Sequence, residues 1–163
     1  MKSISKLIIV FLINIIIIST ASARIISAKL KVNGLTCSMC SKATHKTLSK
    51  ISFIESINPD LENTSFTLTF KQNADINLSE IKNSIEKAGF SVGELILNLD
   101  QPLTSENEVK IGNQNLLLIN NKSGSNEIKV LGHGFLSNKE WDSFIKKQTG
   151  TIIVKNKLYL EAL

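Results

Sequence analysis

Between residues 28 and 98, apolar and polar positions alternate in some segments and recur at helical spacing in others. In 66–70, three apolar residues alternate with two threonines. In 28–33, Leu30 and Val32 alternate with lysines. A period of two is typical of strands that bury one face, so we predict a strand in each of these two segments.

Two further strands are expected at 54–61 and 90–98. Pro59 lies within the first of them, and proline has no N–H to donate to a sheet ladder. We therefore expect that strand at the edge of its sheet. The residues 62–64 supply the turn that leads into the strand at 66–70.

Helical spacing predicts one helix over about 39–50 and a second that begins after Asn77. Asn77 precedes Glu80 by three residues, which is typical of a capped helix start. Gly89 stands where the second helix should end in a left-handed conformation. The first helix is expected to bury Ala43, Thr44, Leu48 and Ile51. In the second, helical spacing is shown by Leu78, Ile81, Ile85 and Ala88.

The resulting order of elements is strand, helix, strand, strand, helix, strand. Such a chain packs two helices on one face of a four-stranded antiparallel sheet, which is the ferredoxin-like arrangement. We therefore predict an α+β fold. Its ferredoxin-like βαββαβ domain spans 28–98, a linker spans 99–107, and a small β-rich module with one helix spans 108–163.

The second module has a weaker pattern. Its helix is predicted from a capping box of Ser137 and Glu140 and from Leu136, which can pack on Trp141 as a hydrophobic staple. Strands are expected on both sides of this helix, and the final two are expected to form a terminal hairpin. These strands are predicted at 109–111, 116–120, 127–131, 151–155 and 158–161.

The N-terminus has the pattern of a secretory signal peptide, which we place at 1–23. Two lysines precede an apolar run at 7–18, and an A-x-A motif ends at Ala23. The run of about twelve residues is shorter than the roughly 20 that span a bilayer. Cleavage near Ala23 would leave a mature chain that is periplasmic or otherwise extracytoplasmic. The alternative is an uncleaved segment, through which alone the chain would contact a membrane.

Charge and composition narrow the function classes. Without the two lysines of the signal segment, 17 basic side chains face 14 acidic ones, a net charge of about +3. The basic residues form no run and have few aromatic neighbours, so we expect no nucleic-acid partner. No catalytic motif stands out, and we predict that the protein is not an enzyme.

Cys37 and Cys40 are the two cysteines of the chain, and three positions separate them. They lie between a predicted strand and the first turn of a predicted helix. Free amides and the helix dipole stabilise a thiolate there. Two thiolates are soft ligands that suit Cu(I), whereas Zn(II) usually takes four ligands. Two sulfurs also leave room for a third sulfur from a partner, which permits direct transfer of the ion.

The loop Gly34-Leu35-Thr36-Cys37-Ser38-Met39-Cys40 resembles the GMTCxxC loop of the heavy-metal-associated domain. This family includes copper chaperones, N-terminal modules of copper-transporting ATPases and periplasmic mercury-binding proteins. Gly89-Phe90 is similar to the Gly-aromatic pair that follows the family's second helix. The resemblance covers about 28–98.

The resemblance implies a metal site at Cys37 and Cys40. It implies that Gly34, Leu35, Thr36 and Phe90 support the loop, with Leu35 at a position that is usually Met in the family. It implies Cu(I) as the ion, with Hg(II) or Zn(II) possible. It also implies a metal donor or acceptor partner, such as a membrane metal transporter. A signal peptide before such a domain resembles the periplasmic mercury binders.

Two other functions remain open at this point. The cysteine pair could serve a thiol–disulfide redox protein, although Trp and Pro, which generally accompany thioredoxin-like sites, are missing around Thr36-Cys37. Alternatively, residues 100–163 could dock a partner while the first domain keeps only its fold. Without metal, Cys37 and Cys40 could also close into a disulfide after export. Met39, His45 and His133 are interpreted as surface residues.

Overall fold

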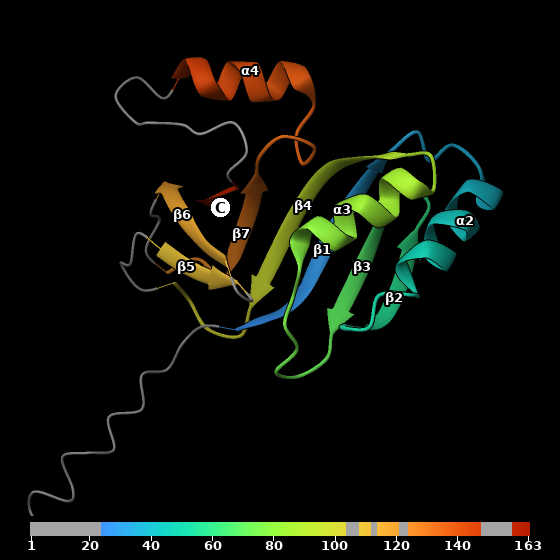
Figure 1. Cartoon of the computed structure of the whole chain (residues 1–163), viewed down its shortest axis with the longest axis horizontal. Helices are drawn as coiled ribbons and strands as arrows, with labels where there is room; N and C mark the ends of the chain where they lie inside the picture. The colour runs from blue at the N-terminus through green and yellow to red at the C-terminus, as the bar shows by residue number, and fades with distance from the viewer. Residues whose placement is uncertain (1–23, 104–107, 112–113, 121–123, 148–157) are drawn as a thin grey trace, which may run out of the picture.

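The computed structural model describes residues 24–103, 108–111, 114–120, 124–147 and 158–163 (Figure 1). The predicted signal peptide and its cleavage site, the 104–107 part of the predicted linker and the strand predicted at 151–155 lie outside these ranges. Within them, no helix combines the length and the apolar character needed to cross a membrane.

The first half of the molecule has the predicted ferredoxin-like order. Its four strands lie in the order β2-β3-β1-β4 with every pairing antiparallel. In Figure 1, helices α2 and α3 lie side by side over this part of the sheet. The elements are β1 Ile25–Asn33, α2 Ser38–Leu48, β2 Ile54–Asp60, β3 Ser65–Phe70, α3 Leu78–Lys87 and β4 Ser91–Leu99. The predicted α+β class is confirmed.

Strand positions follow the sequence pattern closely. The alternating apolar residues of β1 and β3 are buried, and β2, which contains Pro59, lies at the edge of the sheet as predicted. Asn77 caps α3 by accepting hydrogen bonds from the backbone N–H groups of Ser79 and Glu80. Gly89 follows α3 with φ +88°, a left-handed conformation that glycine adopts without strain.

One prediction about α2 is wrong. Ala43 is exposed, and Ser41 is buried instead. The buried stripe of α2 runs through Ser41, Thr44 and Leu48, at spacings of three and four residues. Ala43 precedes Thr44 by one position, which turns its side chain about 100° away from that stripe on a helix of 3.6 residues per turn.

The second half continues the same sheet. Strand β7 (Glu127–Leu131) pairs antiparallel with β4, and Leu97 faces Ile128 across the pair. The full order is β2-β3-β1-β4-β7-β8-β6-β5, with β5 at Glu108–Ile111, β6 at Gln114–Asn120 and β8 at Tyr159–Ala162. The module that the sequence sets apart therefore shares a sheet with the first domain.

The predicted terminal hairpin does not describe β8. Strand β8 lies between β7 and β6, antiparallel to the first and parallel to the second. Leu160 pairs with Val130 on one edge and Leu118 on the other, so both edges of the strand are occupied at that point. Two predicted strands that are adjacent in the sequence suggest a hairpin. A parallel pairing needs a crossover connection instead, and the local sequence pattern does not reveal one.

Helix α4 (Asn138–Lys147) packs on the face of the sheet opposite to α2 and α3. Along β7, Val130 points into the main core, whereas Leu131 contacts Tyr159 and Trp141 in a separate small cluster. Figure 1 shows α4 on the β6–β7 side of the molecule. The predicted capping box is confirmed, because Ser137 and Glu140 exchange hydrogen bonds of 3.0 and 3.3 Å between backbone N–H and side-chain oxygen.

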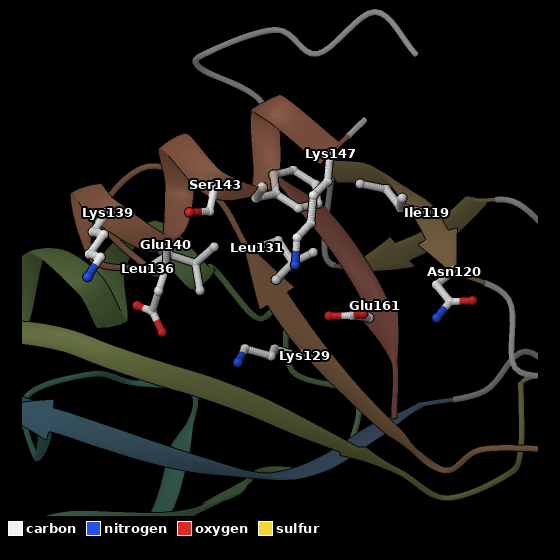
Figure 2. A pocket seen from close by; sticks show the side chains of 11 residues that line it. Ile119, Asn120, Lys129, Leu131, Leu136, Lys139, Glu140, Ser143, Lys147 and Glu161 are labelled. Carbon is white, nitrogen blue, oxygen red and sulfur yellow. The ribbon is translucent and has the colours of Figure 1, made fainter. Parts of the chain in front are cut away.

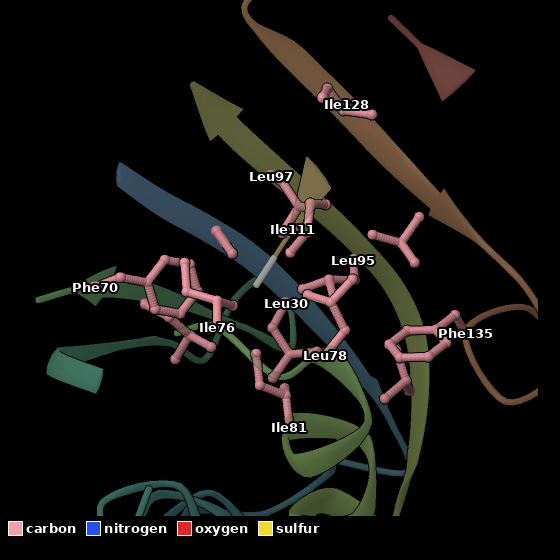
Figure 3. Close-up of a cluster of buried hydrophobic side chains, with 14 of the residues drawn as sticks. Leu30, Phe70, Ile76, Leu78, Ile81, Leu95, Leu97, Ile111, Ile128 and Phe135 are labelled. Atoms are coloured by element: carbon pink, nitrogen blue, oxygen red, sulfur yellow. The ribbon is translucent and has the colours of Figure 1, made fainter. Parts of the chain in front are cut away.

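A single large core joins the two halves (Figure 3). Phe135, in the loop before α4, is 1% exposed and belongs to the same cluster as Leu95 of β4 and Ile81 of α3. Gly134 has φ +87°, and a Cβ there would lie 2.8 Å from Cδ of Lys82 on α3. The loop thus approaches α3 more closely than a larger residue would allow.

Candidate functional site

The loop between β1 and α2 carries the two cysteines, and glycine starts it. Gly34 has φ +86°, in the left-handed region that side chains with a Cβ disfavour. The position of a Cβ on Gly34 would be 3.5 Å from the Phe90 ring, so this aromatic residue lies directly beside the turn. The structure therefore brings together Gly34 and Phe90, which are far apart in the sequence.

Leu35 and Thr36 hold the loop in different ways. Leu35 is 6% exposed and belongs to the main core, so it anchors the loop from below. Thr36 is exposed and contributes through its backbone, because its N–H donates to the carbonyl oxygen of Gly34 at 3.0 Å.

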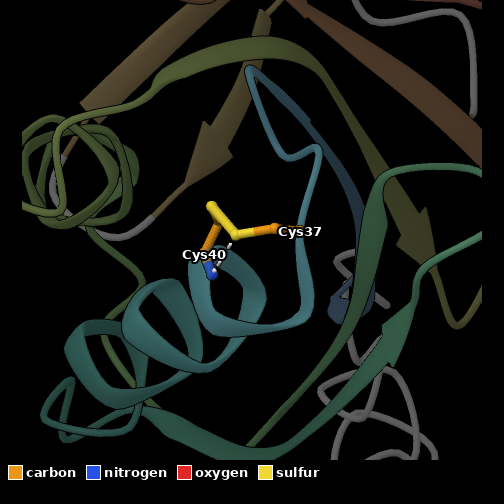
Figure 4. The surroundings of a disulfide bond; sticks show 2 residues. All are labelled: Cys37 and Cys40. Carbon is orange, nitrogen blue, oxygen red and sulfur yellow. Dashed lines mark hydrogen bonds between the residues drawn. A yellow bond between two sulfur atoms is a disulfide. The ribbon is translucent and has the colours of Figure 1, made fainter.

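Cys37 and Cys40 converge at the start of α2 (Figure 4). Their Cα atoms are 5.2 Å apart, and their sulfur atoms are joined in a disulfide. Cys37 is exposed, whereas Cys40 is half-buried and packs against the main core. Cys37 is therefore the more accessible residue of the pair, and Cys40 is the one that packing holds in place.

Cys37 is also the N-cap of α2, which the sequence pattern did not predict. Its backbone is extended, at φ −140° and ψ 155°, and its sulfur accepts a hydrogen bond from the N–H of Cys40 at 3.1 Å. The helix begins at Ser38, one residue before the predicted start. The cap was missed because the predicted helix began at about residue 39, which placed Ser38 rather than Cys37 at the capping position.

The electrostatic surroundings of the loop suit negative charge on sulfur. The first turn of α2 contains no acidic residue, and the backbone N–H of Cys40 donates to the Cys37 sulfur. The amide groups at the start of a helix favour negative charge. Farther along α2, Lys42 and Lys46 are exposed and add positive charge. After reduction, these groups favour the thiolate form that binds soft metal ions.

The other soft or imidazole ligands of the first half stand apart from the pair. Met39 is 72% exposed between the two cysteines, and His45 lies more than one helical turn beyond Cys40. In the part of the chain that the structure describes, no three His, Cys, Asp or Glu side chains gather where they could hold a metal ion. The cysteines therefore present a two-sulfur site that is open on its solvent side.

A cavity of about 780 Å³ lies elsewhere, between α4 and the sheet (Figure 2). Its wall contains Lys129, Lys139 and Lys147 together with Glu140 and Glu161, over an apolar floor. None of its lining residues belongs to the cysteine loop. Because the charges are mixed in sign, this cavity offers no concentrated field for a charged ligand.

The sequence matches the model of the heavy-metal-associated domain over residues 29–91. A copper-transporting ATPase of Helicobacter pylori is 38% identical over 60 residues, which are 37% of this chain and 8% of the ATPase. A second ATPase of that name from Helicobacter pylori strain J99 has the same identity and coverage. The chain thus corresponds to a small fraction of the length of these curated relatives.

Solved structures resemble the same part of the chain. The CopZ metallochaperone is 27% identical, with a TM-score of 0.37, over 40% of this chain and 97% of that protein. The solution structure of apo-CopP from Helicobacter pylori is 26% identical, with a TM-score of 0.36, over 40% of this chain and 97% of CopP.

The matched region contains the second half of β1, the cysteine loop, both helices of the first half, β2, β3 and the first residue of β4. Loop, topology and sequence likeness coincide in this region and support metal binding by the cysteine pair. Residues 29–91 of this chain are therefore a heavy-metal-associated domain.

Proposed function

We propose that this protein binds Cu(I) through the thiolates of Cys37 and Cys40 and passes it to a partner protein. The observation that carries the proposal is the convergence of the two cysteines, with Cα atoms 5.2 Å apart, at the exposed start of α2 within a heavy-metal-associated domain. The likeness to copper-transporting ATPases supports copper as the ion.

Metal binding starts from the reduced pair. The disulfide takes up two electrons and two protons from a thiol reductant and becomes two thiols. Cu(I) then displaces both protons and forms two sulfur bonds. Because Cys37 is exposed, a thiolate of a donor or acceptor can approach the ion as a third ligand, and the ion can move between proteins without release into water.

The number of ligands distinguishes the candidate ions. Cu(I) and Hg(II) both accept two sulfur ligands, whereas Zn(II) usually needs four. In the described part of the chain, no third His, Cys, Asp or Glu joins the pair. Cu(I) is therefore favoured over Zn(II), and Hg(II) is the rival that needs a direct comparison.

The site of action that we propose is outside the cytoplasm. The support is the lysine-led apolar run at 7–18 and the A-x-A motif that ends at Ala23. A membrane copper transporter is the partner that this location and the ATPase likeness favour. Export and transfer would together make the protein a periplasmic metallochaperone or scavenger.

An anaerobic competition titration tests the proposal. The reduced protein competes with a chromophoric Cu(I) chelator, and parallel titrations use Hg(II) and Zn(II). Cys37→Ser and Cys40→Ser should each weaken Cu(I) binding by at least about a hundredfold, since each removes one of two ligands. Ser is a good N-cap, so Cys37→Ser should leave α2 intact.

Met39→Leu is the matched control, because it alters a soft but exposed side chain in the same loop. Its Cu(I) affinity should equal that of the unchanged protein. Equal affinity in the double serine variant would disprove metal binding by the pair. Tighter retention of Hg(II) than of Cu(I) against matched chelators would make mercury the physiological candidate.

The disulfide in the structure favours a thiol–disulfide redox protein as a second candidate. Insulin reduction separates the two functions, because a redox enzyme turns over and a metal carrier does not. We expect no turnover above that of free dithiol. Turnover that Cys37→Ser abolishes would favour the redox function.

A further inference from the structure

Arg24 is held at the start of β1 by an unusual set of contacts, and Asp100 makes most of them. The backbone nitrogen of Arg24 lies 2.7 Å from Oδ1 of Asp100. The Arg24 guanidinium donates to Oδ2 of Asp100 at 3.1 Å and to Oδ1 of Asn73 at 3.3 Å. In return, the backbone N–H of Asp100 donates to the Arg24 carbonyl oxygen at 2.9 Å.

These contacts lie just beyond the regular sheet. Strands β1 and β4 pair from Ile25 and Leu99 inward, so Arg24 and Asp100 are the first residues outside the ladder. The Asp100 side chain is 21% exposed, whereas the Arg24 side chain is 63% exposed. The carboxylate is thus half-buried, with one oxygen directed at the main-chain nitrogen of Arg24.

The contact at the Arg24 nitrogen already has a charged acceptor. Backbone N–H groups donate to oxygen at about 2.7–3.2 Å, so the 2.7 Å separation is an ordinary hydrogen bond to a carboxylate. An ammonium group in the same place would add a full positive charge to this contact.

We propose that Asp100 receives the α-ammonium group of a mature chain that begins at Arg24. The inference rests on the proposed export, since processing by a signal peptidase would create that chain end. Hydrolysis before Arg24 consumes one water and leaves a carboxylate on Ala23 and an amine on Arg24, which takes up a proton. The new ammonium group then forms an ion pair with the Asp100 carboxylate, just beyond the last residue pair of the β1–β4 ladder.

The contact between Asp100 and the Arg24 nitrogen fits one cleavage position. A strand advances about 3.3–3.6 Å per residue, so a chain end one residue earlier would place its ammonium about that far from Arg24 N. Such a group would lose the 2.7 Å contact with Oδ1 of Asp100. The A-x-A motif predicts cleavage before Arg24, and Asp100 lies where the α-ammonium group of that chain would be.

Other charged groups surround this end of the sheet. A cavity of about 450 Å³ beside it is lined by Arg24, Glu55, Lys71 and Asp100 among its charged residues. Lys71 donates to the Ser52 carbonyl oxygen at 2.7 Å, and Glu55 is exposed. The hydrogen bond from the Arg24 backbone holds the pKa of Asp100 below its usual range. Asp100 is thus the carboxylate in contact with the Arg24 nitrogen, and it is ionised at neutral pH.

The ion pair should raise the pKa of the α-amine above its ordinary value of about 8. A group whose pKa is raised on folding stabilises the folded state fully below its unfolded pKa and loses that effect as pH rises through the folded pKa. The contribution is therefore present at neutral pH and lost in alkaline solution.

The test expresses the full chain with its own N-terminus in a bacterial host and recovers the exported protein. Intact mass identifies the first residue, and the rate of α-amine acylation as a function of pH reports the pKa of the amine. Asp100→Asn removes the negative charge that faces the α-amine. Asp60→Asn is the matched control, because Asn63 hydrogen bonds hold the pKa of Asp60 low and no contact links Asp60 to Arg24.

We expect the exported chain to begin at Arg24. Its α-amine should be acylated at pH 7 about tenfold more slowly than the α-amine of Asp100→Asn. The acylation rate of Asp60→Asn should equal that of the unchanged protein. A mature chain with another first residue, or a chain without cleavage, would overturn the inference. Equal amine titration in the unchanged protein and in Asp100→Asn would overturn it as well.

Cu(I) affinity, measured on the same samples, separates this inference from the proposed function. Asp100 lies outside the cysteine loop, so Asp100→Asn should leave copper affinity unchanged. If Asp100→Asn did not change the pKa of the α-amine while copper binding was intact, only the contact between Asp100 and the α-ammonium group would be rejected. Normal amine titration together with absent copper binding would reject the metal function alone.

Discussion

The two halves of this molecule use one sheet for different purposes. In the half formed by β1 to β4, the core supports an exposed loop where two cysteines meet, with Leu35 below the loop and Phe90 beside it. In the half formed by β5 to β8, Phe135 and the strand residues fill the shared core. This difference shows that the candidate chemistry is confined to one loop, whereas the hydrophobic core that stabilises the fold contains residues of both halves.

Phe135→Ala should have the largest effect on stability, because it removes an aromatic side chain that is 1% exposed where the halves meet. We expect a loss of about 3–5 kcal/mol in the free energy of unfolding. Urea denaturation measures it, and Ile26→Ala, at a side chain that is 49% exposed, is the control. Cu(I) affinity of the folded variant should not change. A drop in affinity would show that the second half supports the loop.

Gly34→Ala should have an intermediate effect and should sharpen the comparison within the first half. The left-handed φ of +86° should cost about 1–2 kcal/mol for a residue with a Cβ. Gly89→Ala is the matched control, with φ +88° and open space around the added methyl group. Both variants should lose similar stability in thermal unfolding.

Copper affinity should separate these two glycine variants. Gly34 begins the cysteine loop and lies against Phe90, so strain there should displace Cys37 and weaken binding. Gly89 ends α3 and should leave affinity unchanged. Equal affinities in both variants would mean that the loop tolerates a shifted start.

Ser137→Ala should have the smallest effect, confined to the second half. Loss of the cap on α4 should cost about 1 kcal/mol at neutral pH, measured by urea denaturation. The Ser137 hydrogen bonds hold the pKa of Glu140 below its usual range. A lowered pKa stabilises the fold above the unfolded pKa, and the effect fades as pH falls through the folded pKa.

The stability difference between Ser137→Ala and the unchanged protein should therefore shrink in acid, below about pH 4. Glu80 is the third residue of α3, as Glu140 is of α4, but Asn77 rather than a serine caps α3. An unchanged difference at low pH would assign the effect to the serine cap alone.

Local pattern predicted most of the first half because its strands and helices are neighbours in the sequence. The alternation in β1 and β3, the edge position of Pro59 and the caps at Asn77 and Gly89 were all confirmed. The error at Ala43 came from the phase of α2, which is set by where the helix meets α3 and the sheet. Cys37, the observed cap, lies two residues before the expected helix start at about residue 39.

The second half was harder because its pairings are not local. The pairing of β7 with β4 and the parallel pairing of β8 with β6 join segments that are far apart in the chain. Short apolar strands such as β7 can pair with many edges, so their own residues do not choose a partner. The choice depends on which edge buries Ile128, Val130 and Phe135 in a common core.

By itself, the sequence determined the ferredoxin-like half and the paired cysteines at the start of a helix, because periodicity and ligand chemistry set these features. The residues that support their loop were indicated by the family resemblance. The tertiary structure alone decided that one sheet unites both halves, that α4 covers the opposite face, and that Asp100 meets the main chain at Arg24. Such contacts form between distant segments, and their free energy depends on burial and geometry that exist only after the chain has folded.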